Sequence, residues 1–137
     1  MRSATRIRYA SAIFAFALLL SSLGRADAAN FTGTWSFNGT IVAGNRYATV
    51  SPVCILKQGG SNISGTCKGP NGIGAAAGIV NGNAILVRWN HIPTNSLGLR
   101  GIATFHGAWG SDGVIRGTWM DTAEGSAVGN FSAQKVK

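Results

Sequence analysis

The chain has 137 residues, 20 of them glycine, and a formal net charge of +8 at pH 7. This length provides for one domain rather than two. The basic residues are scattered singly along the chain, whereas nucleic-acid binding needs a concentrated basic stripe, so we expect no nucleic-acid partner.

The first 28 residues have the pattern of a cleavable secretory signal peptide. Three arginines precede an apolar run over 10–20, and Ala-Asp-Ala follows at 26–28. These features predict cleavage before Ala29, and the short Ala-rich signal is typical of bacteria. The run is shorter than the ~20 residues that a spanning helix needs, and no later segment is apolar enough. We therefore expect a secreted or periplasmic protein that does not span the membrane.

Removal of the signal leaves residues 29–137 as a single mature domain. It keeps eight lysines and arginines against three carboxylates, a net charge of +5. A domain of this size buries a modest core, so a covalent link would help to stabilise it. Cys54 and Cys67 are its two cysteines, and in an oxidising compartment they predict a disulfide. A metal site would need more soft ligands, so we expect neither a metal nor a cofactor.

The mature region predicts an all-β fold. Short apolar stretches rich in β-branched and aromatic residues alternate with turn residues, and none shows sustained helical periodicity. Eight strands are expected, at about 31–41, 51–58, 62–68, 74–80, 84–91, 99–109, 114–121 and 126–135. Glycines recur beside aromatic residues on the same strand face, which suits the tight curvature of a small barrel. We predict an up-and-down antiparallel meander closed into a barrel, with a β-sandwich as the alternative.

The cysteine spacing predicts the register of one hairpin. If Gly60 and Ser61 form a two-residue turn, facing residues have numbers that add to 121, and Cys54 then faces Cys67. The disulfide would close only a small loop, so we expect a stabilisation of about 2–3 kcal/mol. Its main role is expected to be locking the register of this hairpin.

Connection length distinguishes the two ends of the predicted barrel. Three connections are tight turns rich in glycine, asparagine and serine, and the four that alternate with them are mostly longer. The tight turns lie at 59–62, 81–83 and 110–113, and the others at 42–50, 69–73, 92–98 and 122–125. Alternate connections of a meander lie at opposite ends, so the longer loops are expected to form a mouth.

Candidate binding residues follow from this layout. Tryptophans near strand ends would form apolar walls, and polar side chains of the mouth would form the rim, as in sites for small ligands. The candidates are Trp35, Tyr47, Trp89, His91, Asn95, Trp109, Trp119 and Asp121. The alternative interpretation of the tryptophans is that they are packed core residues.

Catalysis is not expected. Asp112 lies in a turn in which an aspartate caps the backbone. Asp121 and Glu124 share one mouth connection, and His91 starts another, so all three are expected to be solvated loop residues rather than an acid–base system. His106 is expected to point outward, because it alternates with the inward Phe105.

Four short motifs resemble the calycin-like small barrels, the group of avidin, streptavidin and the lipocalins. Gly33-Thr34-Trp35 is similar to the G-x-W that opens those barrels, and the stretches 85–89, 105–109 and 116–119 each end in tryptophan. The resemblance implies a ligand-binding barrel that tends to form homo-oligomers. The polar biotin-binding residues of the family have no match here, and Asn130 lies near the position of an expected aspartate, so biotin binding is not implied.

These observations predict an exported, non-catalytic barrel that holds a small hydrophobic or amphipathic ligand at its mouth. The alternative is a secreted protein-interaction module, such as an envelope-surface protein or an enzyme inhibitor that uses the loop 91–98. Pro93 would preset the shape of that loop, and Leu97 would contact the partner.

Overall fold

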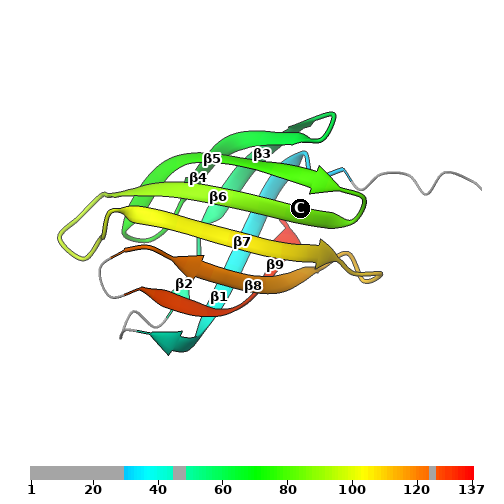
Figure 1. The fold of residues 1–137 in the computed structure, drawn as a ribbon. Helices are drawn as coiled ribbons and strands as arrows, with labels where there is room; N and C mark the ends of the chain where they lie inside the picture. The colour runs from blue at the N-terminus through cyan, green and yellow to red at the C-terminus, as the bar shows by residue number, and fades with distance from the viewer. Residues whose placement is uncertain (1–29, 45–48, 124–125) are drawn as a thin grey trace, which may run out of the picture.

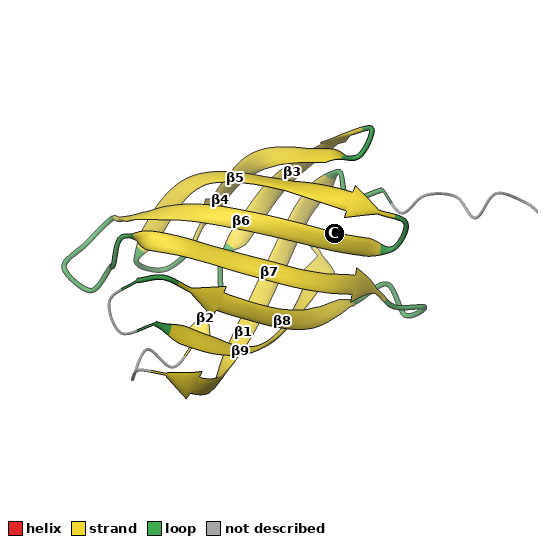
Figure 2. Ribbon diagram, in the orientation of Figure 1, coloured by secondary structure: helices red, strands yellow, loops and turns green. Residues whose placement is uncertain are grey.

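Nine antiparallel strands form the structure, a computed structural model that describes residues 30–44, 49–123 and 126–137 (Figure 1). The strands are β1 Gly33–Gly44, β2 Thr49–Val50, β3 Val53–Gly59, β4 Asn62–Lys68, β5 Gly72–Asn81, β6 Ala84–Pro93, β7 Gly101–Trp109, β8 Ile115–Asp121 and β9 Ala127–Lys135. None of the described residues is helical (Figure 2), so none forms a helix that could cross a membrane. The predicted signal peptide, residues 1–28, lies outside the described residues.

The sheet closes into a barrel. Each strand pairs with the next along the chain, apart from β2 and β3, which both pair with β1, and β1 also pairs with β9. Gly39 of β1 faces Val50 of β2, and Ser36 faces Val53 of β3, so β2 and β3 keep one register against β1. They form a single barrel strand interrupted near Pro52, which has no N–H to donate to the ladder. The predicted eight-stranded antiparallel meander is therefore confirmed.

The hairpin of β3 and β4 has the register that the cysteine spacing predicts. Cys54 faces Cys67, and the facing pairs continue to Gly59 and Asn62 beside the turn. A disulfide joins the two cysteines, whose side chains are buried inside the barrel. Gly60 takes the positive φ of 61° that a tight two-residue turn requires.

The two ends of the barrel differ as the connection lengths predict. The tight turns β3–β4, β5–β6 and β7–β8 gather at one end, called here the turn end, and the other connections gather at the opposite end, the mouth (Figure 1). Some mouth segments are more ordered than predicted. The predicted loop 42–50 contains the end of β1 and all of β2, and β6 continues to Pro93 because its pairing with β5 persists there.

Aromatic side chains fill the barrel from the turn end to its middle. Phe31, Trp35 and Trp109 pack together at the turn end, with the Trp109 ring centroid 5.1 Å from Phe31 and 5.3 Å from Trp35. Further along the axis, three phenylalanine rings lie with centroids 4.9–5.8 Å apart. These are Phe37, Phe105 and Phe131. Because the interior is filled from the turn end to the middle of the barrel, space for a ligand inside the barrel lies toward the mouth.

Candidate functional site

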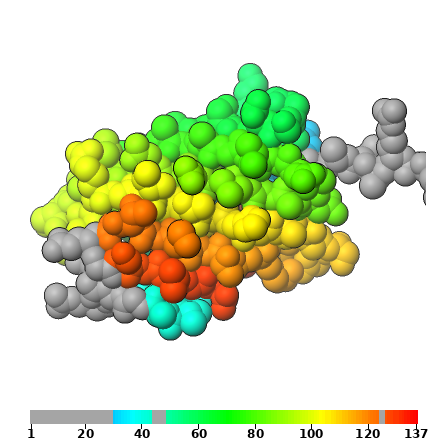
Figure 3. All heavy atoms as spheres, viewed as in Figure 1, coloured from blue at the N-terminus to red at the C-terminus, as the bar shows by residue number. Residues whose placement is uncertain are grey.

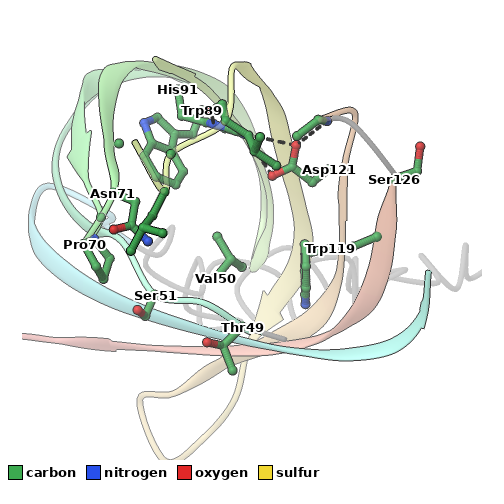
Figure 4. Close-up of a pocket in the computed structure, with 17 residues that line it drawn as sticks. Thr49, Val50, Ser51, Pro70, Asn71, Trp89, His91, Trp119, Asp121 and Ser126 are labelled. Carbon is green, nitrogen blue, oxygen red and sulfur yellow. Dashed lines mark hydrogen bonds and ion pairs between the residues drawn. The ribbon is translucent and has the colours of Figure 1, made fainter. Parts of the chain in front are cut away.

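A cavity of about 190 Å³ lies at the mouth (Figure 4). Its apolar lining includes Trp89 of β6, Trp119 of β8 and Val50 of β2. The charged side chains in its described lining are His91 and Asp121, which belong to the mouth ends of β6 and β8. The cavity therefore combines aromatic walls with one polar cluster.

Trp119 packs against the backbone of two glycines, which leave space for its ring. A Cβ atom added at Gly39 would lie 2.6 Å from the indole Nε1, and one at Gly129 would lie 2.9 Å from it. The indole N–H donates to the carbonyl oxygen of Thr40 at 3.2 Å. The glycines of β1 and β9 thus make room for a large ring, which is the physical basis of the aromatic–glycine pattern in this part of the sequence.

Trp89 forms the wall on the other side. Its ring centroid lies 4.9 Å from that of His91, and a Cβ atom at Gly69 would lie 3.0 Å from its six-membered ring. The side chain is almost fully buried, and its Nε1 has no hydrogen-bond partner among the residues that the structure describes. Trp89 is therefore fixed by packing rather than by its polar atom.

His91, which is buried, and Asp121, which is partly buried, form a pair. Nε2 of His91 lies 2.9 Å from Oδ2 and 3.0 Å from Oδ1 of Asp121, and Nδ1 donates to the carbonyl oxygen of Leu99 at 2.6 Å. The two side chains are 8% and 15% exposed. Oδ1 of Asp121 also accepts the backbone N–H of Ala123 at 2.8 Å. The pair therefore ties together the ends of two strands and both connections that follow them.

The charges of this pair support each other. The hydrogen bond to Asp121 raises the pKa of His91 and outweighs burial, which acts in the opposite direction. Burial by itself would raise the pKa of Asp121, but the hydrogen bonds from His91 and from the Ala123 backbone lower it overall. Since both ring nitrogens of His91 face oxygen acceptors, the arrangement suits an imidazolium beside a carboxylate. The expected solvated positions for His91 and Asp121 are therefore wrong.

A second polar contact joins two loops at the rim. Asn95 donates from Nδ2 to Oδ1 of Asn71 at 3.0 Å, and the backbone N–H of Thr94 donates to the carbonyl oxygen of Asn71 at 3.0 Å. Asn95 also accepts the backbone N–H of Leu97 at 2.9 Å. Asn71 lines the cavity, and these bonds hold the β6–β7 loop against the β4–β5 connection.

The structure divides the predicted site residues into separate groups. Four of them line the cavity together, namely Trp89, His91, Trp119 and Asp121. Asn95 does not line it, but it is hydrogen-bonded to Asn71, which does. The remaining tryptophans, Trp35 and Trp109, lie in the core at the turn end and contribute nothing to this cavity. Tyr47 lies outside the described residues. Alternation along each strand places all four indoles inward, and it says nothing about their depth along the barrel axis.

Several cavity residues lie outside the set of predicted binding residues, among them three consecutive ones. Thr49, Val50 and Ser51 line the wall, although 42–50 was expected to be a loop and 51 the first residue of a strand. Their location depends on the pairing of β2 with β1, in which Val50 faces Gly39. The short polar–apolar alternation of these three residues before Pro52 is a signal in the sequence for this pairing.

The carboxylate expected to act as a turn cap does so. Asp112 accepts the backbone N–H of Val114 at 3.1 Å and pairs with Arg116 at 2.7 Å, far from the mouth in the β7–β8 turn. The hydrogen bond from Arg116 lowers the pKa of Asp112 to about 2. His106 is exposed on the outer wall, as predicted. The described residues contain no cluster of histidine, cysteine and acidic side chains that could hold a metal ion.

Apolar side chains on the outer wall bear on the prediction of a homo-oligomer. Ile102, Met120 and Val128 are 39%, 54% and 42% exposed. Met120 faces Val128 across β8 and β9, two of the strands on the face seen in Figure 3. Homo-oligomer formation stays a prediction.

Comparisons with protein-family models, with characterised proteins and with solved structures found no match for this chain. The class that the structure defines is a small, closed, antiparallel β-barrel with an internal disulfide and a cavity at its mouth. The barrel is compatible with the predicted resemblance to calycin-like proteins, and membership of that group stays a prediction.

Proposed function

We propose that this domain is an exported, non-catalytic binding protein that holds a small hydrophobic or amphipathic ligand at the mouth of the barrel. The observation that carries the proposal is the cavity bounded by Trp89, Trp119 and the His91–Asp121 pair. Sites for small ligands combine mostly apolar walls with a few fixed polar groups, and this cavity has both. The interior between this cavity and the turn end is filled, which restricts the ligand to the mouth.

A non-catalytic role is supported by the hydrogen bonds of His91. A general base needs a ring nitrogen that is directed at the proton it removes. Here Nδ1 is bonded to the carbonyl of Leu99 and Nε2 to the carboxylate of Asp121, so both nitrogens are occupied. The pair is arranged to hold the mouth in shape rather than to transfer a proton.

Export is supported by the disulfide. Disulfides such as Cys54–Cys67 persist in the periplasm and outside the cell and are rare in the cytosol. Mass spectrometry of the protein recovered from the periplasm and medium of a bacterial host tests this directly. The expected mass is that of residues 29–137 less two hydrogen atoms, and a full-length, reduced protein in the cytosol would contradict export.

The binding proposal can be tested with one variant and a matched control. Val50→Phe fills the cavity from inside, whereas Val53→Phe makes the same change on the outer wall, where Val53 is 43% exposed. A mixture of small neutral fragments is added, and the indole N–H signals are followed by NMR. We expect the signals of Trp89 and Trp119 to shift in the wild type and in Val53→Phe, but not in Val50→Phe.

Two results would overturn this proposal. One is the absence of any fragment-induced shift in the wild-type protein. The other is equal binding to Val50→Phe, which would show that the fragments bind somewhere else. The indoles of Trp35 and Trp109 report from the turn end in every sample, so general effects of the fragments are seen separately.

One observation favours the alternative of a protein-interaction module. Leu97, in the β6–β7 loop, is 72% exposed, although it is a large apolar residue. An inhibitor that inserts this loop into a cleft would lose binding on the change Leu97→Ser. Recovery of one defined partner on an affinity column, lost with this variant, would support that function instead.

A further inference from the structure

We infer that the ligand of the mouth cavity is a neutral, hydroxyl-bearing molecule built on a single six-membered ring, with one hydroxyl donating to Oδ2 of Asp121. This inference rests on the proposed binding function and adds the size, charge and polar group of the ligand. Each of these three properties follows from a separate feature of the cavity.

The size follows from the volume. Ligand sites for drug-sized molecules are typically about 300–1,000 Å³, and an engineered cavity of about 150 Å³ holds benzene. A cavity of about 190 Å³ therefore accepts one six-membered ring with a small substituent. Below it the packed phenylalanine rings of Phe37, Phe105 and Phe131 prevent a long chain from entering the barrel.

The absence of ligand charge follows from the His91–Asp121 pair. An anion would need free donors, but both N–H groups of His91 already donate, to Asp121 and to the carbonyl of Leu99. A cation would gain from the indole faces, but it would lie beside an imidazolium that already neutralises the carboxylate. His91 and Asp121 are the ionised side chains of the described lining, and their charges cancel. The site therefore favours a molecule without net charge.

The hydroxyl group follows from the unused capacity of the carboxylate. Oδ1 of Asp121 accepts from both His91 and the Ala123 backbone, whereas the hydrogen bond to Oδ2 among the described residues comes from His91; the backbone N–H of Thr122 also faces this carboxylate and lowers its pKa. Each carboxylate oxygen has two lone pairs, so Oδ2 can accept one more donor. Asp121 lies on the inner side of its strand, at the cavity that Trp119 and Val50 line (Figure 4). A bound hydroxyl group is a neutral donor that fits there.

Two kinds of molecule share this chemistry, an aromatic or alicyclic alcohol and a sugar ring. The experiment therefore compares para-cresol and methyl glucopyranoside, which are neutral and carry hydroxyls, with three matched probes. Toluene lacks the hydroxyl, 4-hydroxyphenylacetate carries a negative charge, and tyramine carries a positive one. Binding is measured by calorimetry and by the indole N–H shifts of Trp89 and Trp119.

We expect para-cresol or the pyranoside to bind at least about tenfold more tightly than toluene, because a hydrogen bond to a charged acceptor has about that effect. The two charged probes carry the same hydroxyl as para-cresol, and they should bind more weakly because their charge would leave water without gaining a free partner of opposite charge. The variant Asp121→Asn should reduce the preference over toluene severalfold, because it replaces the charged acceptor with a neutral amide, which forms a weaker hydrogen bond. Asp112→Asn makes the same change in an exposed turn far from the mouth and should retain it. Thermal unfolding of both variants establishes that they fold.

The outcomes separate this inference from the proposed function. If toluene, tyramine or 4-hydroxyphenylacetate binds as tightly as both neutral hydroxyl probes, the cavity is a binding site but the inferred ligand class is wrong. If Asp121→Asn folds and keeps the preference undiminished, the assignment of Oδ2 is wrong. If no probe binds, the proposed binding function fails together with the inference.

Discussion

His91 and Asp121 are hydrogen-bonded at 2.9 Å although a whole strand lies between them. His91 lies near the end of β6 and faces Gly101 of β7. Asp121 is the last residue of β8 and faces Ala103, which also belongs to β7. The two side chains meet over Gly101, where a Cβ atom would lie 2.9 Å from Oδ1 of Asp121. The missing side chain of Gly101 is what allows this contact, and several expected outcomes depend on it.

The pair is expected to make stability depend on pH in both directions. Because the pKa of His91 is raised above 6.5, its contribution is complete below 6.5 and is lost as pH rises through the raised value. Because the pKa of Asp121 is lowered below 3.8, its contribution is complete above 3.8 and is lost as pH falls through the lowered value. The pair should therefore contribute most to the free energy of unfolding, measured with urea, between pH 3.8 and pH 6.5.

The variant His91→Gln should lower the free energy of unfolding by about 2 kcal/mol near pH 6, because it leaves a partly buried carboxylate without its charged donor. The exposed His106 provides the control, and His106→Gln should have little effect. Equal pH profiles of the wild type and His91→Gln would show that the pair does not contribute to stability.

Gly101→Ala is expected to destabilise the protein by about 1–3 kcal/mol, as overpacking typically does. The new Cβ would lie 2.7 Å from the backbone nitrogen of Ala123 as well as close to Asp121. Gly59→Ala is the matched control, because no atom lies within 4 Å of the corresponding position. Urea unfolding of both variants measures the difference, and similar midpoints would contradict the crowding at Gly101.

Two tryptophans allow a comparison of hydrogen bonding at equal volume. Nε1 of Trp35 donates to the carbonyl oxygen of Phe31 at 2.9 Å, whereas Nε1 of Trp89 finds no acceptor among the described residues. Trp35→Phe and Trp89→Phe remove the same atoms, but only the first leaves a buried carbonyl without its donor. We expect Trp35→Phe to cost about 1–2 kcal/mol more than Trp89→Phe in denaturant unfolding. The reverse order would point to a hydrogen-bond partner for Trp89.

Loss of the disulfide is expected to reduce stability without changing the fold. The double variant Cys54→Ala, Cys67→Ala should unfold about 2–3 kcal/mol more easily, because the cross-link no longer restricts the unfolded chain. A reductant should lower the urea midpoint of the wild type and leave that of the variant unchanged. Amide NMR spectra of the variant should keep the dispersion of a folded β-sheet, and a collapsed spectrum would show that the bond is needed for folding.

Much of the fold is readable from local patterns. The positions of the strands follow from alternation and from glycine-rich turns, and the register of Cys54 with Cys67 follows from a two-residue turn between them. In such a hairpin each pairing is set by residues close in the chain, so the sequence contains the information directly. The separation of tight turns from longer loops at opposite ends follows from the meander in the same way.

By itself, then, the sequence determined an all-β meander, the hairpin disulfide and which residues face inward, because each depends on neighbours along the chain. Only the tertiary structure decided that Trp89 and Trp119 line a cavity while Trp35 and Trp109 are packed against Phe31 in the core, because an open or a filled interior depends on side chains from strands far apart in the chain. It likewise decided that His91 and Asp121, 30 residues apart, are hydrogen-bonded to each other rather than solvated. Their contact requires two adjacent strand pairings and the space over Gly101, and no local pattern encodes that combination.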